Sequence, residues 1–225
     1  MGYSVYSIDK KRKASLIDTG VVTTEDNRAK VIPRITHKQR TDITGKKKMV
    51  KVKSKRKGNA TESHHEAAST LSKAIVKLVK QHNIVLGMAE LPTGSENAKS
   101  ALLLGYAGGI AISAFIALDI ELIRISPNEV KHKATELLKE KLGITMPEKE
   151  EPNKKQIMEL ALHMYPTSAE NATKVFKSGA EKIMEGVYEH IADSVIIFEH
   201  GYATEAFQKF LDTSDIKLYQ QGAKK

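Results

Sequence analysis

Short β-rich segments alternate along the chain with longer segments of helical periodicity. Gly2 to Asp9 and Ala14 to Thr24 alternate apolar with small polar residues, and the charged run Lys10 to Lys13 separates them. This pattern predicts an antiparallel hairpin. Val31 to Ile35 and Met49 to Val52 could form further short strands, but we favour a basic arm without fixed structure there.

The middle of the chain has the pattern helix, strand, helix, strand. Glu62 to His82 has helical spacing of apolar residues, and Ile84 to Glu90 is short and branched enough for a strand buried on both faces. A polar turn precedes a long apolar helix that starts at Asn97, and Glu121 to Ile125 is the next strand. The helix between them is then a right-handed crossover, which predicts that the two strands are parallel.

Helices dominate the C-terminal half. We expect a helix from Pro127 to about Gly143, a charged loop from Pro147 to Pro152 and a helix from Lys154 to Tyr165. We expect Thr167 to Gly179 to be an insertion with helical character, and Ala180 to Phe198 to form the final long helix.

A chain of 225 residues suits one domain. We expect that domain to carry a basic insertion at about residues 25–60 and a flexible C-terminal tail from about residue 202, amphipathic at first and polar at its end.

The composition limits the chemistry. The sequence has no cysteine, which excludes thiolate ligands and Cys nucleophiles, so any metal must be held by oxygen and nitrogen. The longest apolar run, Ala101 to Leu118, is interrupted by glycines and predicts a core helix rather than a membrane span. With no signal-peptide pattern either, we expect a cytoplasmic protein without membrane contact.

The positive charge is concentrated in one segment. Glu25 to Ala60 holds 13 of the 36 Lys and Arg but three of the 27 Asp and Glu, so it accounts for the whole net charge of +9. Such a segment is typical of a site for a polyanion, although a solvated loop without a partner has the same composition. The candidate nucleic-acid contacts in its densest part are Lys46, Lys47, Lys48, Lys51, Lys53, Lys55, Arg56 and Lys57.

Three side chains could form a catalytic site. Glu90 ends a predicted strand, where ligands bind in open α/β sheets, and His190 and Asp193 share one face of the last helix. Carboxylate oxygens with one imidazole suit a hard divalent ion such as Mg²⁺ or Mn²⁺. Simpler interpretations remain open: Glu90 as the first solvated residue after a strand, and His190 with Asp193 as an ordinary surface pair.

Six blocks in order resemble the RuvC family of Holliday junction resolvases, which have the RNase H-like fold. They are GYSVYS, LIDTGVVTT, MAELPTGSENAKSALLLGYAGGIAI, PNEVKHKAT, NKKQIMELAL and HIADSVIIFEH. Each block alone is a weak signal, but their order and spacing over most of the chain make the resemblance fairly specific. It implies a mixed central sheet with helices on both faces.

The resemblance also implies a mechanism. Glu90 and Asp193 would bind Mg²⁺ or Mn²⁺, and His190 would be a further ligand or a proton-transfer group beside the attacking water. Lys131 and Lys154 would contact DNA phosphates, although each may equally be an ordinary exposed lysine. Family members act as homodimers on four-way DNA, with the helix after the Glu strand at the interface. The glycines of that helix could instead serve close packing on its own sheet.

The chain departs from the family in three ways. The family's first strand ends in a catalytic Asp that has no counterpart here, and Asp9 should point elsewhere. We therefore expect coding sequence upstream of Met1 to supply that strand, and cleavage without it to be slower by orders of magnitude. The basic segment is longer than usual in the family. Pro92 and Thr93 replace a frequent base-stacking aromatic, so base-sequence preference should be weak or different.

The resulting hypothesis is a dimeric, metal-dependent endonuclease acting on branched DNA. A junction-binding or nucleic-acid-binding protein that does not cleave is the main alternative. An ATP-binding protein of the same broad fold is less favoured, and no nucleotide cofactor is expected, because no Gly-rich phosphate loop follows later in the chain.

Overall fold

The computed structural model describes the chain except for residues 24–30, 42–46, 58–59, 92–97, 149, 176–180 and 214–225. It divides into two compact units. The smaller unit is Thr23–Leu71, and the larger combines Met1–Val22 with Ser72–Lys225. We expected one domain with a basic insertion at about residues 25–60, and the smaller unit includes that segment.

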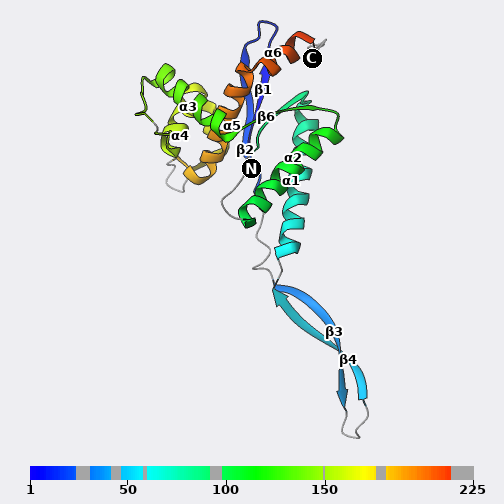
Figure 1. Cartoon of the computed structure of the whole chain (residues 1–225). Coiled ribbons are helices and arrows are strands. Elements are labelled where there is room, and N and C mark those ends of the chain that lie inside the picture. The colour runs from blue at the N-terminus through cyan, green and yellow to red at the C-terminus, as the bar shows by residue number, and fades with distance from the viewer. Residues whose placement is uncertain are drawn as a thin grey trace. The chain divides into compact units, whose positions relative to one another are not determined.

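Helices and strands are mixed along the chain, which confirms an α/β fold class (Figure 1). The elements in chain order are β1 (Gly2–Ile8), β2 (Ala14–Val21), β3 (Val31–Thr41), β4 (Lys47–Lys57), α1 (Ala60–His82), β5 (Leu86–Glu90), α2 (Ala98–Ala117), β6 (Glu121–Ile125), α3 (Pro127–Leu142), α4 (Lys154–Met164), the 3-10 helix η2 (Pro166–Ala172), β7 (Thr173–Val175), β8 (Glu181–Ile183), α5 (Glu185–Ala203) and α6 (Glu205–Thr213).

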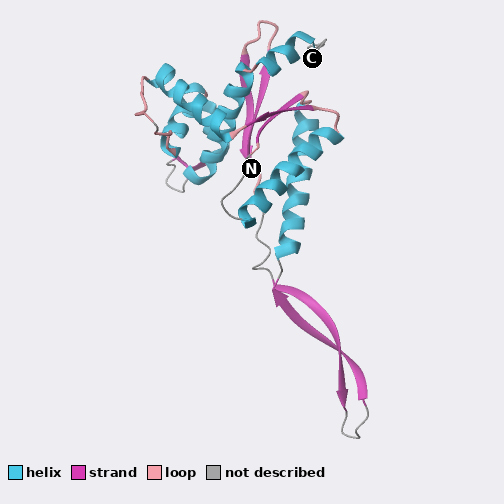
Figure 2. Cartoon of the chain, viewed as in Figure 1, coloured by secondary structure: helices cyan, strands magenta, loops and turns pink. Residues whose placement is uncertain are grey.

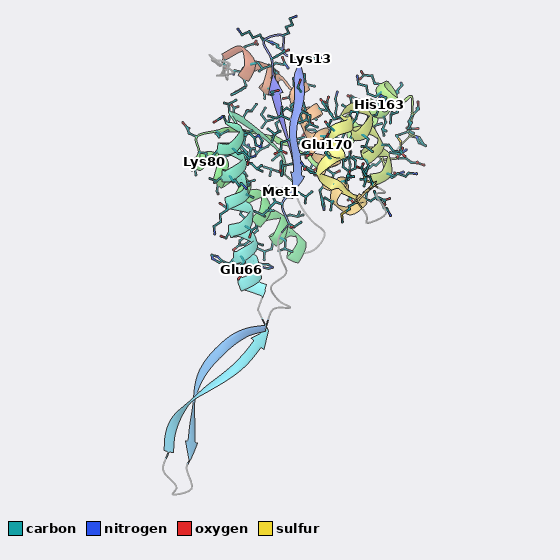
Figure 3. The ribbon with its side chains drawn as sticks, turned by 180° about the vertical axis from the view of Figure 1, so that it is seen from behind. Met1, Lys13, Glu66, Lys80, His163 and Glu170 are labelled. Carbon is teal, nitrogen blue, oxygen red and sulfur yellow. The ribbon has the colours of Figure 1, made fainter. Side chains whose placement is uncertain are left out.

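The predicted hairpin is confirmed. β1 and β2 pair antiparallel, with Gly2 opposite Val21 and Ile8 opposite Ala14. The carboxylate of Asp9 accepts hydrogen bonds from the backbone N–H groups of Lys11 and Lys13, both at 2.8 Å, so this side chain closes the turn. Figure 3 labels Lys13 at the turn and Met1 at the opposite end of the hairpin.

The predicted crossover unit is also confirmed. β5 and β6 pair in parallel, with Leu86 opposite Glu121 and Glu90 opposite Ile125, and α2 connects them. α1 packs on α2 through a cluster in which the side chains of Ile75, Val79 and Ala114 are buried. Apolar positions spaced by the helical period therefore produced the expected packing.

α3 and α4 have strong end signals. Ser126 forms a capping box with Glu129, and Gly143 closes α3 with a φ of 68°. Asn153 caps α4 and exchanges hydrogen bonds with Gln156. These signals explain why the predicted limits of both helices are close to the observed ones.

α5 is buried along much of its length. One hydrophobic cluster joins it to α4 and η2, and a second joins it to α3 and α4. The α5 residues in these clusters are Tyr188, Ile191, Ala192, Val195 and Ile196, each at most 1% exposed. The position of this helix is therefore set by packing on several sides.

Two predictions for the C-terminal half were wrong. The last helix, expected from Ala180 to Phe198, starts only at Glu185, because Glu181–Ile183 pairs as β8 with Thr173–Val175. The flexible tail expected from about residue 202 begins instead with the end of α5 and the helix α6. Phe207 of α6 is buried against the β6 side chains Ile123 and Ile125.

The basic arm has more regular structure than expected. β3 and β4 pair antiparallel over eleven residues each, seen as the long twisted pair of arrows in Figure 2. Apolar and basic residues alternate clearly only around Met49 to Lys53. The pattern therefore underestimated a hairpin that is held by backbone hydrogen bonds between its two strands and has no continuous apolar face.

A single central sheet is not formed by the described strands, which pair two by two. α5 contacts both β1 and β5, yet no ladder joins these two strands. The predicted mixed sheet is thus represented in the larger unit by the β1–β2 and β5–β6 pairs on a shared helix. No helix within the described ranges is long and apolar enough to cross a membrane.

The packing of β5 on α2 leads to a first prediction. A Cβ on Gly87 would lie 2.5 Å from Cε1 of Phe115 and 2.9 Å from Cδ1 of Leu122. We expect Gly87→Ala to lower the free energy of unfolding by about 1–3 kcal/mol, because the aromatic ring must move. Urea denaturation followed by circular dichroism measures this change.

Gly186→Ala in α5 is the matched control. An added Cβ there has no atom within 4 Å, so the substitution should raise the free energy of unfolding by roughly 0.5–1 kcal/mol through helix propensity. Equal effects of the two substitutions would contradict the close contact between β5 and α2.

Candidate active site

Glu90 lies at the carboxyl end of β5. It is opposite Ile125 in the parallel pair, and the N–H of Leu91 donates a hydrogen bond of 2.9 Å to the carbonyl oxygen of Ile125. The strand end is therefore held in place. The Glu90 side chain is half-buried, and burial raises its pKa, while the positive charge of Lys131 opposes that rise.

β1 positions the facing part of α5. The Ser4 hydroxyl donates a hydrogen bond of 3.1 Å to the carbonyl oxygen of Ser194. A Cβ at Gly2 would overlap the backbone carbonyl of His190, so the strand can approach the helix this closely only without a side chain. These contacts hold the helical turn that carries His190 and Asp193.

Asp193 has the clearest electrostatic signature of the site. Burial, followed by the negative charges of Glu189 and Glu90, raises the pKa of its carboxyl from an ordinary 3.8 to about 6, against the opposing effect of His190 and Lys154. The structure thus brings Glu90 and His190 each within electrostatic range of Asp193, with His190 exposed to solvent.

Each of the two predicted lysines lies near a predicted carboxylate. The ammonium group of Lys154 forms an ion pair with Glu189, and Asp193 adds to the negative charge around it. Lys131 is within electrostatic range of Glu90 and forms an ion pair of 2.8 Å with Glu151. Both lysine side chains are substantially exposed, so they are accessible to a polyanion.

Sequence reasoning missed Glu189. It lies one helical turn before Asp193 on α5, and its charge contributes to the raised pKa of that residue. The i, i+4 spacing of Glu189 and Asp193 indicates that the two carboxylates share a helix face, but the prediction used only the i, i+3 spacing of His190 and Asp193. Glu189 makes the site more negative than predicted.

The donor chemistry suits a hard cation. Glu90, Glu189 and Asp193 offer carboxylate oxygens, and crowding of these groups is what a divalent ion would relieve. Among the described residues, however, no group of three or more His, Asp or Glu is close enough to hold a metal ion. The ligand set Glu90, His190 and Asp193 therefore remains a prediction.

The other predicted contacts lie elsewhere in the chain. Lys47 to Lys57 forms β4 of the smaller unit and carries the remaining candidate basic residues except Lys46. Lys46, Pro92 and Thr93 lie outside the described residues. The Asp9 carboxylate accepts hydrogen bonds within the β1–β2 turn and so points away from the predicted site, as expected.

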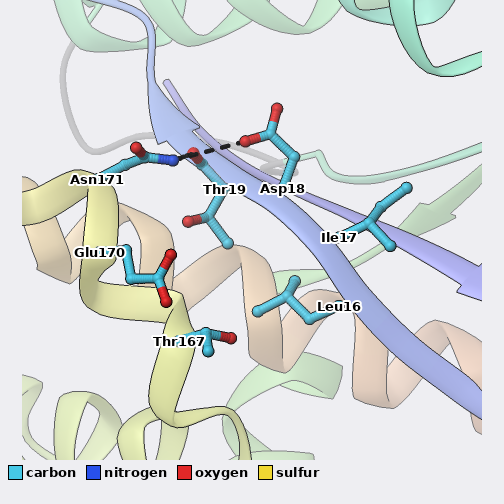
Figure 4. A pocket seen from close by; sticks show the side chains of 7 residues that line it. All are labelled: Leu16, Ile17, Asp18, Thr19, Thr167, Glu170 and Asn171. Carbon is cyan, nitrogen blue, oxygen red and sulfur yellow. Dashed lines mark hydrogen bonds between the residues drawn. The ribbon is translucent and has the colours of Figure 1, made fainter.

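A separate hollow lies between β2 and η2 (Figure 4). It is lined by Leu16, Ile17, Asp18, Thr19, Thr167, Glu170 and Asn171, none of which belongs to the predicted site. The Asp18 carboxylate is hydrogen-bonded to the His82 ring, with 2.9 Å between Oδ2 and Nε2. The Asn171 amide donates a hydrogen bond to the carbonyl oxygen of Thr19. These contacts have a structural role: they tie α1 and η2 to the hairpin.

Comparisons with known proteins give weak likenesses. Neither a protein-family model nor a curated protein matches the chain. Among solved structures, a complex of Thermus thermophilus RuvC with a Holliday junction substrate is 14% identical, with a TM-score of 0.42 and coverage of 81% of this chain and 97% of that one. A second Thermus thermophilus RuvC structure is 12% identical, with a TM-score of 0.38 and coverage of 76% and 95%. Likeness at this level assigns no family.

The raised pKa of Asp193 predicts a pH effect on stability. The folded state binds the Asp193 proton more tightly than the unfolded chain, so the free energy of unfolding falls as pH rises from about 4 to 6. Asp193→Asn removes this loss. After allowance for partial exposure, we expect the variant to gain about 1–2 kcal/mol over the wild type on going from pH 4 to pH 7.5.

Urea denaturation at both pH values measures this gain. Asp119→Asn is a suitable control, because Asp119 is exposed in a turn with a φ of 55° that asparagine also accommodates. A pH response of Asp193→Asn no larger than that of Asp119→Asn would contradict the crowded carboxylate site.

Proposed function

We propose that the chain is a metal-dependent endonuclease that hydrolyses phosphodiester bonds in four-way or otherwise branched DNA, with the RNase H-like fold of the RuvC family. The observation that carries the proposal is the coupling between Glu90 and Asp193, with Lys131 and Lys154 nearby. A buried negative centre with cations beside it suits a metal ion and a phosphate together. The preference for branched DNA rests on the sequence resemblance.

The residues have distinct proposed roles. Glu90 and Asp193 hold Mg²⁺ or Mn²⁺, which when bound supplies a Lewis acid for water and phosphate oxygens. Glu189 adds negative charge and orients Lys154 through their ion pair. His190, exposed at the edge of the site, ligates the ion or accepts a proton from water. Lys131 and Lys154 position the scissile phosphate.

We further propose that the protein is a homodimer that joins through α2. Leu102, Leu103, Leu104, Tyr106 and Ile116 of this helix are exposed. A Cβ added to Gly105 or Gly109 would meet no atom within 4 Å, so these glycines are not explained by packing on the chain's own sheet. An exposed apolar face of this kind is typical of a protein interface.

A non-cleaving nucleic-acid-binding protein is the second candidate. It is favoured by the strands β3 and β4, which together have ten Lys and Arg and no Asp or Glu. The basic segment would then be the functional part of the chain. Binding of branched DNA without cleavage separates this candidate from the nuclease.

Glu90→Gln tests the nuclease directly. We expect the wild-type chain to nick a synthetic four-way junction in Mg²⁺ or Mn²⁺ at the low rate expected from the sequence, and the variant to show no nicking above background, because an amide cannot replace a carboxylate ligand. Junction affinity, measured by gel shift in Ca²⁺, should change less than about threefold. Denaturing gels of end-labelled junction report the cleavage.

Glu121→Gln on the neighbouring strand β6 is the control, since Glu121 is exposed at the start of that strand. It should leave nicking unchanged. Junction binding by the wild type with no nicking in either metal ion would exclude the nuclease for this chain and favour the second candidate.

Leu103→Glu tests the interface. Analytical ultracentrifugation should find the wild type as a dimer and the variant as a monomer, because a charge would be buried at the apolar face. Ile17→Glu, at an exposed apolar position on β2, should leave the dimer intact. A monomeric wild type would refute this interface.

A further inference from the structure

The β3–β4 ribbon sorts its charges by face. The two strands pair in continuous register from Val31 opposite Lys57 to Thr41 opposite Lys47. Residues opposite each other share a face, and successive residues alternate between faces. The ribbon has ten Lys and Arg and no Asp or Glu, and each face carries five of them.

The two faces differ in chemistry. One face, here called the lysine face, has all its Lys and Arg on β4: Lys47, Lys51, Lys53, Lys55 and Lys57. Four of these occupy every second position without interruption, opposite mainly apolar β3 residues. The arginine face has basic residues of both strands, separated by Thr, Val and Ser: Arg34, Lys38, Arg40, Lys48 and Arg56. The basic residues of the lysine face thus all occupy positions along one strand, β4.

The spacing of the lysines and the length of β4 both match the dimensions of duplex DNA. Alternate residues of a strand advance about 6.6–6.8 Å, while each DNA strand advances about 3.4 Å per nucleotide, so one lysine corresponds to two nucleotides of rise. Eleven strand residues span roughly 35 Å, about one turn of the duplex.

The groove geometry favours DNA over RNA. The major groove of B-form DNA admits a two-stranded ribbon, whereas the deep, narrow groove of an A-form RNA helix does not. Lysine acts as a compact point charge suited to phosphate, without the paired donors by which arginine reads base edges. A single row of lysines therefore fits a backbone better than a base sequence.

We propose that the ribbon lies in the major groove of a duplex DNA arm with its lysine face along one phosphate backbone, independently of base sequence, and that the arginine face contributes less to this contact. The inference deepens the proposed function, from which it takes DNA as the ligand, but it requires no cleavage. It assigns the partner of the ribbon as an unbranched duplex rather than the junction centre.

Two full-chain variants of equal charge test the inference. One replaces the five lysines of the lysine face by glutamine, and the other replaces the five basic residues of the arginine face by glutamine. Fluorescence anisotropy with a 30-base-pair duplex over a KCl series gives the slope of log K against log salt. Each lost phosphate contact removes about 0.9 from the magnitude of that slope.

The lysine-face variant should lose about 3–4.5 of slope magnitude, and the arginine-face variant less than half as much. Equal losses would show that only total charge matters and would overturn the inference, as would a larger loss in the arginine-face variant. Unchanged slopes in both, with junction nicking intact, would refute the ribbon contact and leave the proposed function standing. A wild type that binds neither duplex nor junction would refute both.

RNA is the remaining alternative partner. A duplex RNA of the same length should bind the wild type at least about tenfold more weakly at the same salt, because its groove excludes the ribbon. Equal or tighter binding to the RNA, with the same dependence on the lysine face, would overturn the assignment to DNA.

Discussion

The burial of α5 is the constraint on which the rest of the larger unit depends. Its inner side chains pack at once against α3, α4 and η2, and each fully buried aliphatic group contributes roughly 1.5–3 kcal/mol. β1 docks on the same helix through the bond from Ser4 to Ser194 and the stacking of Tyr6 on Phe198, whose ring centroids are 3.5 Å apart. A rotation of α5 would expose apolar surface and break these contacts, so the direction in which its polar edge faces is strongly determined.

That edge carries the acidic residues of the candidate site. Burial on the inner side brings Asp193 into a partly desolvated position, where a carboxylate is less stable than in water, and Glu189 lies one turn away. Glu90 adds a third negative group from the end of β5, and among the described residues Lys131, Lys154 and His190 offset the charge. The fold thus holds like charges together at an energetic cost, a condition often found at sites that bind a cation or transfer protons.

The two units differ in the chemistry of their charged residues. The larger unit has a small acidic centre with a few lysines, suited to acting on one phosphate. The ribbon of the smaller unit has many cations and no acidic residue, suited to long contacts whose strength depends on salt.

Local signals in the sequence determined the elements whose stability is local. Helical spacing, the cap at Ser126, Gly143 and the crossover between Glu90 and Glu121 placed α1, α3, α4 and the β5–β6 pair. The structure alone decided what no clear local pattern specifies. The hairpins β3–β4 and β7–β8 are held by backbone hydrogen bonds without a continuous apolar pattern, and Glu189 joined the site only because the packing of α5 brings Asp193, on the same side of the helix, near Glu90. Residue spacing specifies which side chains share a face of one element, but the direction of that face is set by everything packed around it.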